Sequence, residues 1–107
     1  MENGGRKTTL KAQEIFKTTV DGLVTDQYLA YKDDNPGLIS FEWLEEPSEY
    51  GSELIRAIQK KVGATVDGHI GPKTIKAMQE YFGTKQDGCI SNPSDLVRAF
   101  QKWLNKQ

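Results

Sequence analysis

A short repeated pattern holds the residues of this chain whose types could bind a metal ion or act in catalysis. Gln59 is followed eight residues later by Asp67-Gly68-His69, and Gln79 is followed at the same distance by Asp87-Gly88-Cys89. Histidine and cysteine are ligands for zinc, and a cysteine thiol can also be a nucleophile when a base activates it. The repeat is therefore the first candidate for a metal site or a catalytic pair.

Comparison of the copies favours a structural role instead. An earlier copy, Val20-Asp21-Gly22-Leu23-Val24, follows Gln13 and has leucine at the position of His69 and Cys89. One histidine and one cysteine are too few for a four-ligand zinc site, and they lie in different loops. We therefore expect no metal and no cofactor, and we expect Cys89 to be a small semi-buried residue.

The recurring Gln, Asp and Gly residues fit a turn that is tied to a helix. Glycine supplies a positive φ angle, and the aspartate can accept backbone N–H groups ahead of it. Each glutamine lies beside an apolar helical stripe, so its amide can tie the helix to a neighbouring loop. The apolar residue two places after each glycine would plug the loop into the core; these are Val24, Ile70 and Ile90. The residues assigned to the structural repeat are Gln59, Asp67, Gly68, Gln79, Asp87 and Gly88.

Three helices, each of about ten residues by their apolar periodicity, must position these loops. Ser52 is a good N-cap for the first helix, and Gly63 fits its C-terminal end. Pro72 begins the second helix, which Gly83 ends, and Asn92-Pro93-Ser94 begins the third. A compact three-helix bundle with Asp-Gly loop repeats is therefore predicted.

Two other segments complete the predicted fold, which is mainly α. A short helix is expected from Thr8 or Thr9 to about Lys17. Residues 25–50 depart from the repeat and carry a strong turn signal at Asn35-Pro36-Gly37, with partial alternation from Leu38 to Leu44. They are predicted to form an extended or β-hairpin-like insert.

Composition sets the class of protein. The chain has 107 residues, a mean hydropathy of -0.62 and a net charge of -1. Residues 21–50 carry eight acids against Lys32 alone, whereas residues 51–107 carry nine Lys or Arg against five acids. This balance argues against a nucleic-acid binder, and no stretch approaches the roughly 20 apolar residues of a membrane span. The start of the chain has no apolar h-region, so no signal peptide is expected.

The whole chain is expected to be one domain in three parts. Residues 1–7 are predicted to be a flexible leader, residues 8–50 a degenerate first repeat with the aromatic and acidic insert, and residues 51–107 the helical repeats.

The pattern resembles the peptidoglycan-binding module of bacterial cell-wall hydrolases and phage endolysins. The residues that carry the resemblance are Leu54-Ile55-Arg56-Ala57-Ile58-Gln59, then Val66-Asp67-Gly68-His69-Ile70-Gly71-Pro72-Lys73-Thr74, then Ala77-Met78-Gln79. That family is marked by a helix with a central glutamine, then D-G-x-[IFY]-G-x-x-T, then a second helix. The resemblance covers about residues 53–104. The copy at Asp87 is degenerate, with Ser91 in place of Gly71, and residues 8–24 look like a poorer copy in which Lys17 stands where Gly63 and Gly83 stand.

The resemblance implies an α-helical, non-catalytic module that docks an attached amidase, muramidase or peptidase onto the bacterial wall. It looks most like the C-terminal targeting region of endolysins from phages that infect Gram-positive bacteria. The expected partners are peptidoglycan or an associated wall glycopolymer and the attached catalytic domain. The expected place of action is the cell wall, as part of a phage-encoded or secreted lytic enzyme.

Aromatic and basic side chains are the candidate ligand contacts, because sugar rings stack on aromatic faces. The candidates are Tyr28, Tyr31, Phe41, Trp43, Tyr50 and Lys73, with Tyr31 and Trp43 first among them. The lysine is expected to meet phosphate or carboxylate groups of wall polymers. The alternative is that several of these rings seal the insert onto the helices and that the lysine is simply solvated.

Two other functions stay open. A glycosidase needs two carboxylates flanking the bond, and the carboxylates of residues 33–46 lie instead in an acidic run that is typical of a solvated face. A protein-interaction module that assembles with a full-length lysin, or with itself as a homo-oligomer, would use the apolar residues of the insert.

Overall fold

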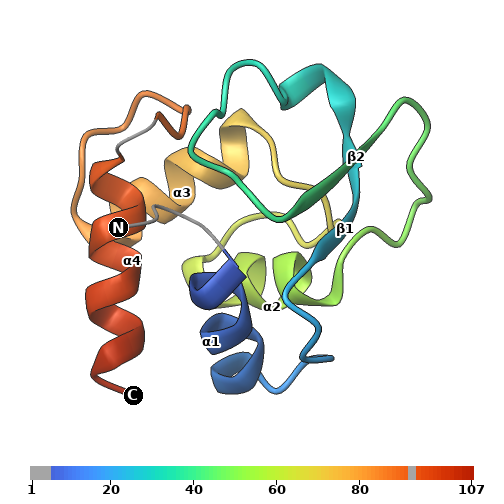
Figure 1. Ribbon diagram of the computed structural model, residues 1–107. Helices are drawn as coiled ribbons and strands as arrows, with labels where there is room; N and C mark the ends of the chain where they lie inside the picture. The colour runs from blue at the N-terminus through green and yellow to red at the C-terminus, as the bar shows by residue number, and fades with distance from the viewer. Residues whose placement is uncertain (1–5, 92–93) are drawn as a thin grey trace.

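Four helices surround the core in the computed structural model, which describes residues 6–91 and 94–107. Within these residues the helices are α1 (Arg6–Phe16), α2 (Glu53–Val62), α3 (Pro72–Phe82) and α4 (Asp95–Asn105). They pack as a ring, because each contacts the next and α4 returns to α1. Figure 1 shows these helices on one side of the molecule and the insert on the other. The mainly α fold is confirmed, but the three-helix bundle is not, since α1 packs on both α2 and α4.

The ends of α2, α3 and α4 follow the capping chemistry of the sequence. The hydroxyls of Ser52 and Ser94 accept the N–H groups of the third residues of their helices, at 3.3 and 3.2 Å. Pro72 is the first residue of α3. Gly63 and Gly83 end α2 and α3 in the left-handed conformation, with φ of 81° and 77°. These predicted boundaries are confirmed; residues 92–93, which were expected to precede α4, lie outside the described part.

Helix α1 corrects the expected start of the ordered chain. It begins at Arg6, so the last two residues of the predicted leader, Arg6 and Lys7, are helical, while residues 1–5 lie outside the described part. At its other end Lys17 takes φ of 61°, and the Thr18 N–H donates to the Gln13 carbonyl at 2.9 Å. Lys17 therefore has the left-handed conformation of Gly63 and Gly83, as expected for a third copy.

The insert forms a pair of parallel strands, so the β-hairpin is wrong. Strand β1 (Val24–Tyr28) runs parallel to β2 (Phe41–Leu44), with Gln27 opposite Trp43. A tight turn joins only antiparallel strands, whereas here the chain passes through the short 3-10 helix η1 (Leu29–Tyr31) and a loop before β2 begins. The register shifts between Val24 and Gln27, at Asp26, whose φ is 65°.

The core lies inside the ring of helices and is closed by the three loop plugs. Val24, Ile70 and Ile90 are 2%, 2% and 1% exposed, which confirms the plugs predicted from the repeat. The helices contribute the other buried apolar side chains, which are Ala12, Leu54, Ile55, Ile58, Ile75, Met78, Leu96, Val97, Phe100 and Leu104. Within the described residues, no helix is both long enough and apolar enough to cross a membrane.

Candidate functional site

The second Asp-Gly loop is tied to α2 by one buried side chain. The Gln59 amide donates to the Asp67 carboxylate at 2.8 Å and to the His69 carbonyl at 3.0 Å, and its oxygen accepts the N–H groups of Asp67 and Gly68. Gln59 is fully buried, and its amide also donates to the Thr74 hydroxyl at 3.0 Å. The predicted tie between helix and loop is present, and here it also reaches α3.

The same bonds recur in the other two copies. In each, the glutamine amide donates to the aspartate and to the carbonyl after the glycine, and the glycine N–H donates to the glutamine oxygen; the residues are Gln13, Asp21, Gly22 and Leu23, and Gln79, Asp87, Gly88 and Cys89. The glutamine amide, followed by the N–H after the glycine, lowers the pKa of Asp21 and of Asp87. At Asp67 burial raises the pKa, but the hydrogen bonds from His69 N–H and Gln59 outweigh it and the net pKa is lowered.

The insert connects all three loops, which the sequence did not indicate. The N–H of each loop plug donates to a different group of the insert. The three pairs are Val24 with the Ser40 carbonyl at 2.9 Å, Ile70 with Gln27 Oε1 at 2.6 Å, and Ile90 with Asn35 Oδ1 at 2.8 Å. Gln27 and Asn35 are 0% and 2% exposed, so both carboxamides are part of the interior. The insert is therefore built into the fold rather than appended to it.

A groove of about 490 Å³ opens where the insert meets the second loop and the start of α3. Tyr28 and Tyr31 form one wall, with their ring centroids 6.4 Å apart, and His69 stands 4.8 Å from Tyr28. Lys73 and Gly71, from the start of α3, line the same groove. This volume lies within the range of about 300–1,000 Å³ that ligand sites usually occupy.

Local bonds hold the two tyrosines in place. The Gln27 amide, next to Tyr28, donates to the Gly68 carbonyl at 2.8 Å and so fixes the end of β1 against the second loop. The Asn35 amide donates to the Tyr31 carbonyl at 2.7 Å. A Cβ at Gly71 would lie 3.4 Å from the Tyr31 ring, so this glycine leaves room for the ring over the start of α3.

The predicted ligand residues do not form a single cluster. Tyr28, Tyr31 and Lys73 line the groove, but Phe41 and Trp43 stack on each other 5.2 Å apart and pack against the core. The sealing role left open for some of these rings therefore describes Phe41 and Trp43. Tyr50 is 55% exposed and lies outside the groove lining, 4.2 Å from the Arg56 guanidinium.

Sequence reasoning missed three residues of this site. His69 was set aside because its repeat position varies, yet its ring forms part of the groove wall and its Nε2 is buried without a hydrogen-bond partner. Gln27 and Asn35 carry no sequence signal of burial, because polar residues in an irregular segment are usually exposed.

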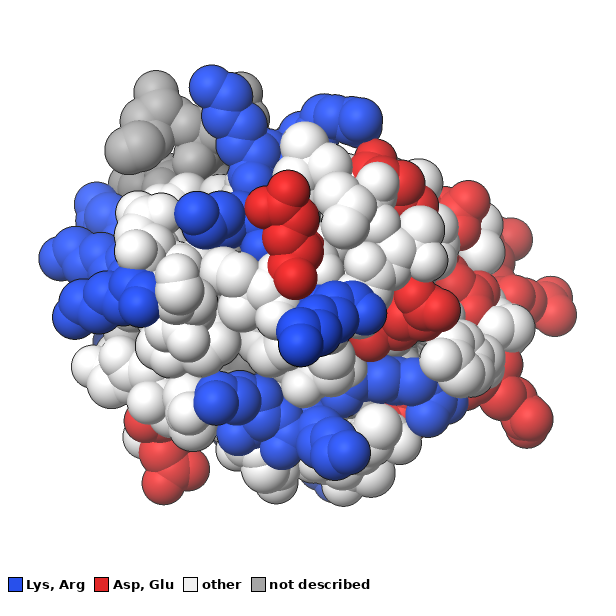
Figure 2. Space-filling view, turned by 90° about the horizontal axis from the view of Figure 1, so that it is seen from below, with Lys and Arg blue, Asp and Glu red and all other residues white. Residues whose placement is uncertain are grey.

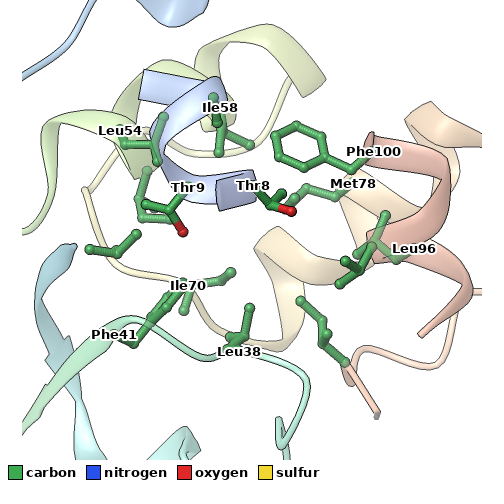
Figure 3. Close-up of a pocket in the computed structure, with 15 residues that line it drawn as sticks. Thr8, Thr9, Leu38, Phe41, Leu54, Ile58, Ile70, Met78, Leu96 and Phe100 are labelled. Carbon is green, nitrogen blue, oxygen red and sulfur yellow. The ribbon is translucent and has the colours of Figure 1, made fainter. Parts of the chain in front are cut away.

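The interior of the ring holds a separate, smaller cavity. It measures about 60 Å³ and is lined by apolar side chains from all four helices and the insert; among the described residues that line it, Thr8 and Thr9 are the only polar ones. Figure 3 shows Leu38 and Phe41 facing it from the insert. It is too small for a sugar ring and offers almost no hydrogen bonds, so it is a packing defect rather than a binding site.

His69 and Cys89 occupy the same repeat position but differ in exposure: His69 is half-buried and Cys89 is exposed. Among the residues that the structure describes, no three His, Cys, Asp or Glu side chains are arranged to hold a metal ion. Cys89 is exposed, so its expected semi-burial is wrong. The reason is the alternation along the loop, which turns Ile90 inward and the residue before it outward.

Comparisons with protein-family models, with curated proteins and with solved structures give no match for this chain.

Proposed function

We propose that this chain is a non-catalytic module that binds the Gram-positive bacterial wall and targets an attached lytic enzyme of endolysin type to it. The groove beside the second loop carries the proposal. The loop that bears the family-like residues, from Asp67 to Thr74, forms one side of it, and two tyrosines of the insert form the other. The part of the chain that resembles a wall-binding module is thus the part that faces an open, aromatic groove.

The groove has the groups that a glycan requires. The faces of Tyr28 and Tyr31 offer apolar surface for a sugar ring, while their hydroxyls and Lys73 offer hydrogen bonds to hydroxyl and carboxylate groups. Tyr28 is 39% exposed, so much of its surface is available to a ligand. Peptidoglycan combines sugar rings with carboxylate-bearing peptides, and this mixture matches the lining of the groove.

Binding to purified sacculi of Gram-positive bacteria tests the proposal. The chain is expected to sediment with the sacculi, and Tyr31→Ala is expected to weaken binding by on the order of ten-fold, as truncation of a central aromatic contact usually does. Tyr50→Ala is the matched control, because it removes an exposed tyrosine outside the groove. Circular dichroism of both variants separates a lost contact from a lost fold.

The outcomes distinguish wall binding through the groove from binding elsewhere and from enzymatic activity. Failure to sediment with sacculi from several genera would contradict wall binding, and equal loss in the two variants would place the ligand elsewhere on the insert. A decrease in the turbidity of susceptible cells on addition of this chain alone would show that it is an enzyme.

A further inference from the structure

The tyrosine groove, which is the groove lined by Tyr28 and Tyr31, has three aromatic rings at steep angles in its walls. The two tyrosine rings meet edge to face with an interplanar angle of 80°, and the His69 ring is inclined by 60° to that of Tyr28, 4.8 Å away. Aromatic rings that line an opening at such angles attract ammonium groups to their faces by cation–π interaction. The groove therefore has walls that suit a cation as well as a sugar ring.

The Asp67 carboxylate gives the same groove a negative charge with one free oxygen. Its Oδ1 accepts the Gln59 amide at 2.8 Å and the His69 N–H at 3.0 Å, so its position is fixed. In the part of the chain that the structure describes, its Oδ2 accepts no hydrogen bond and has no Lys or Arg nitrogen within 4.0 Å. A carboxylate oxygen is a strong acceptor for an ammonium N–H. The groove thus has a preorganised acceptor beside its rings.

His69 adds a polar atom that has no partner. Its Nε2 is buried, on the ring that packs against Tyr28, and it forms no hydrogen bond within residues 6–91 and 94–107. Buried polar atoms without partners are rare in folded proteins, and a functional role is one of the few explanations for them. The other copies have Leu23 and Cys89 at this position, so the ring and its nitrogen belong to the second loop alone.

The groove carries charges of both signs. Lys73 lines it together with Asp67, yet the two exposed side chains form no ion pair, since Arg98 and Asp95 form the only pair within the described residues. Figure 2 shows Asp and Glu gathered on the side where Figure 1 places β2 and the loop that follows it, and Lys and Arg gathered over the helices. The insert, which supplies the two tyrosines, lies on the acidic side, so the field of that side attracts a cation toward the groove.

We propose that the tyrosine groove binds the peptide part of peptidoglycan through a diamino acid residue. The side-chain ammonium group of that residue lies against the tyrosine rings and donates to Asp67 Oδ2, and a carboxylate of the same peptide meets Lys73. This inference rests on the proposed function and names the part of the wall polymer that the groove selects. A glycan chain alone has no cation for Asp67, and a quaternary ammonium such as choline has no N–H group to donate to Oδ2. A primary ammonium supplies both the charge and the donors.

The test compares two soluble peptides that differ in one acetyl group. The first is alanyl-γ-D-glutamyl-lysyl-D-alanyl-D-alanine with its N-terminus acetylated, so that its lysine carries the only ammonium group; in the second the lysine is acetylated as well. Each peptide is titrated into the isotope-labelled chain and followed by NMR, and the amide signals of residues 28–31 and 67–74 are expected to shift most. The second peptide is expected to bind about ten-fold more weakly, because it loses both the cation–π attraction and the charge-assisted hydrogen bond.

The second and third loops provide matched variants, Asp67→Asn and Asp87→Asn. Each keeps an amide oxygen that can accept the glutamine amide and the N–H after the glycine, and each removes one negative charge. Asp67 lines the tyrosine groove, whereas Asp87 is outside its lining. Asp67→Asn is expected to reduce the preference for the free ammonium from about ten-fold to about two-fold, and Asp87→Asn is expected to leave it at about ten-fold. Circular dichroism of both variants checks that they are folded.

Four results would overturn the inference. Equal binding of the two peptides would mean that the ammonium group is not recognised, and equal loss of the preference in the two variants would mean that net charge alone produces it. Displacement of the first peptide by an N-acetylglucosamine tetramer or by phosphocholine, at equal concentration, would mean that a glycan or a quaternary ammonium occupies the groove. Sedimentation with sacculi that depends on Tyr31, without binding of the first peptide, would leave the proposed function standing and overturn this inference alone.

Discussion

The second and third Asp-Gly loops have the same internal bonds but different surroundings. In both, a buried glutamine holds the aspartate, the glycine N–H and the carbonyl after the glycine. The second loop packs directly against the backbone where the insert ends and α2 begins: a Cβ at Gly68 would lie 1.9 Å from the Tyr50 carbonyl oxygen, and the Ser52 N–H donates to the Gly68 carbonyl at 2.9 Å. The third loop also meets the backbone of the insert, but after its glycine: the Gly37 N–H donates to the Ile90 carbonyl at 2.9 Å, and the Asn35 side chain accepts the Ile90 N–H.

This difference separates the structural role that all copies share from the groove that lies beside the second copy alone. The glutamine and aspartate set the shape of every loop, so they cannot account for a groove that lies beside only one of them. Two features belong to the second loop alone. Tyr28 and Tyr31 stand beside its His69, and it has Gly71 where the third loop has Ser91. Recognition is therefore expected to depend on the insert, and stability on the shared bonds.

The largest contrast is expected between Gly68→Ala and Gly88→Ala. Both glycines have positive φ, but a Cβ at Gly68 would lie 1.9 Å from the Tyr50 carbonyl oxygen, whereas a Cβ at Gly88 would meet the flexible end of Lys76 at 3.2 Å. Gly68→Ala is expected to destabilise the chain by about 4 kcal/mol or more, because backbone must move. Gly88→Ala is expected to lower the free energy of unfolding by only about 1–2 kcal/mol, which is the cost of the left-handed conformation for a residue with a side chain.

Urea unfolding of the two variants, followed by circular dichroism, measures this contrast. If both lose the same stability, the close approach of the insert to the second loop adjusts easily, and the distinction between the loops fails.

A smaller contrast is expected between the glutamines. Gln59 makes an additional bond to the Thr74 hydroxyl and accepts the Asp67 N–H, so Gln59→Ala leaves more buried groups without partners than Gln79→Ala does. The expected losses are about 3 and about 2 kcal/mol, given about 1–3 kcal/mol for a buried polar group left unsatisfied. Gln86→Ala, at an exposed position just before Asp87, is the control. A larger loss at Gln79 would contradict the assignment of the second loop as the more constrained one.

Acid should weaken all three copies together. The pKa values of Asp21, Asp67 and Asp87 are lowered from the ordinary value of 3.8, and the Ser48 hydroxyl lowers the pKa of Asp26 in the insert. A carboxylate whose pKa is lower in the folded state stabilises the fold above its unfolded pKa, and this contribution is lost as pH falls through the folded pKa. The urea midpoint is therefore expected to stay nearly constant from about pH 7 to 5 and to fall below about pH 4.

The variant Asp87→Asn tests this cause. Its amide oxygen can still accept the Gln79 and Cys89 donors, but it has no charge to lose, so the fall of the urea midpoint below about pH 4 is expected to be shallower. An unchanged fall would mean that other carboxylates control the acid transition.

The local features of the fold were predictable from the sequence, and the assembly of the insert was not. Ser52, Pro72 and Gly83 act within one turn of the chain, so their residue types are enough to predict helix ends. The parallel pairing of β1 with β2 depends on what the intervening residues pack against, which no short pattern contains.

The candidate groove shows the same limit. Tyr28, Tyr31 and Lys73 were predicted as ligand contacts from their type and are neighbours in the groove, but Trp43 was predicted with equal reason and packs against the core. An aromatic side chain suits a binding groove and a hydrophobic core equally well. Which of the two it occupies depends on the tertiary packing of the insert, which the residue type does not reveal. Gln27 and Asn35 could not be predicted because their side-chain oxygens accept backbone N–H groups more than 40 residues away, those of Ile70 and Ile90.

The smallest expected effect concerns the first copy, where Lys17 stands in place of the glycines of the other two. Its φ of 61° is unfavourable for a residue with a side chain, by about 1–2 kcal/mol. Lys17→Gly is therefore expected to stabilise the chain by about 1 kcal/mol, after the greater freedom of glycine in the unfolded chain is subtracted. Urea unfolding at neutral pH measures the change.

The reciprocal variant Gly83→Lys is the control, because a Cβ at Gly83 would have no atom within 4 Å and only the backbone conformation is affected. It should lose about as much stability as Lys17→Gly gains, since residues 17 and 83 both end a helix in the left-handed conformation. A gain at residue 17 without a matching loss at residue 83 would mean that the Lys17 side chain, rather than its backbone, disfavours the first copy. Equal and opposite changes would show that the three copies are one structural unit, of which the first tolerates a less suitable residue.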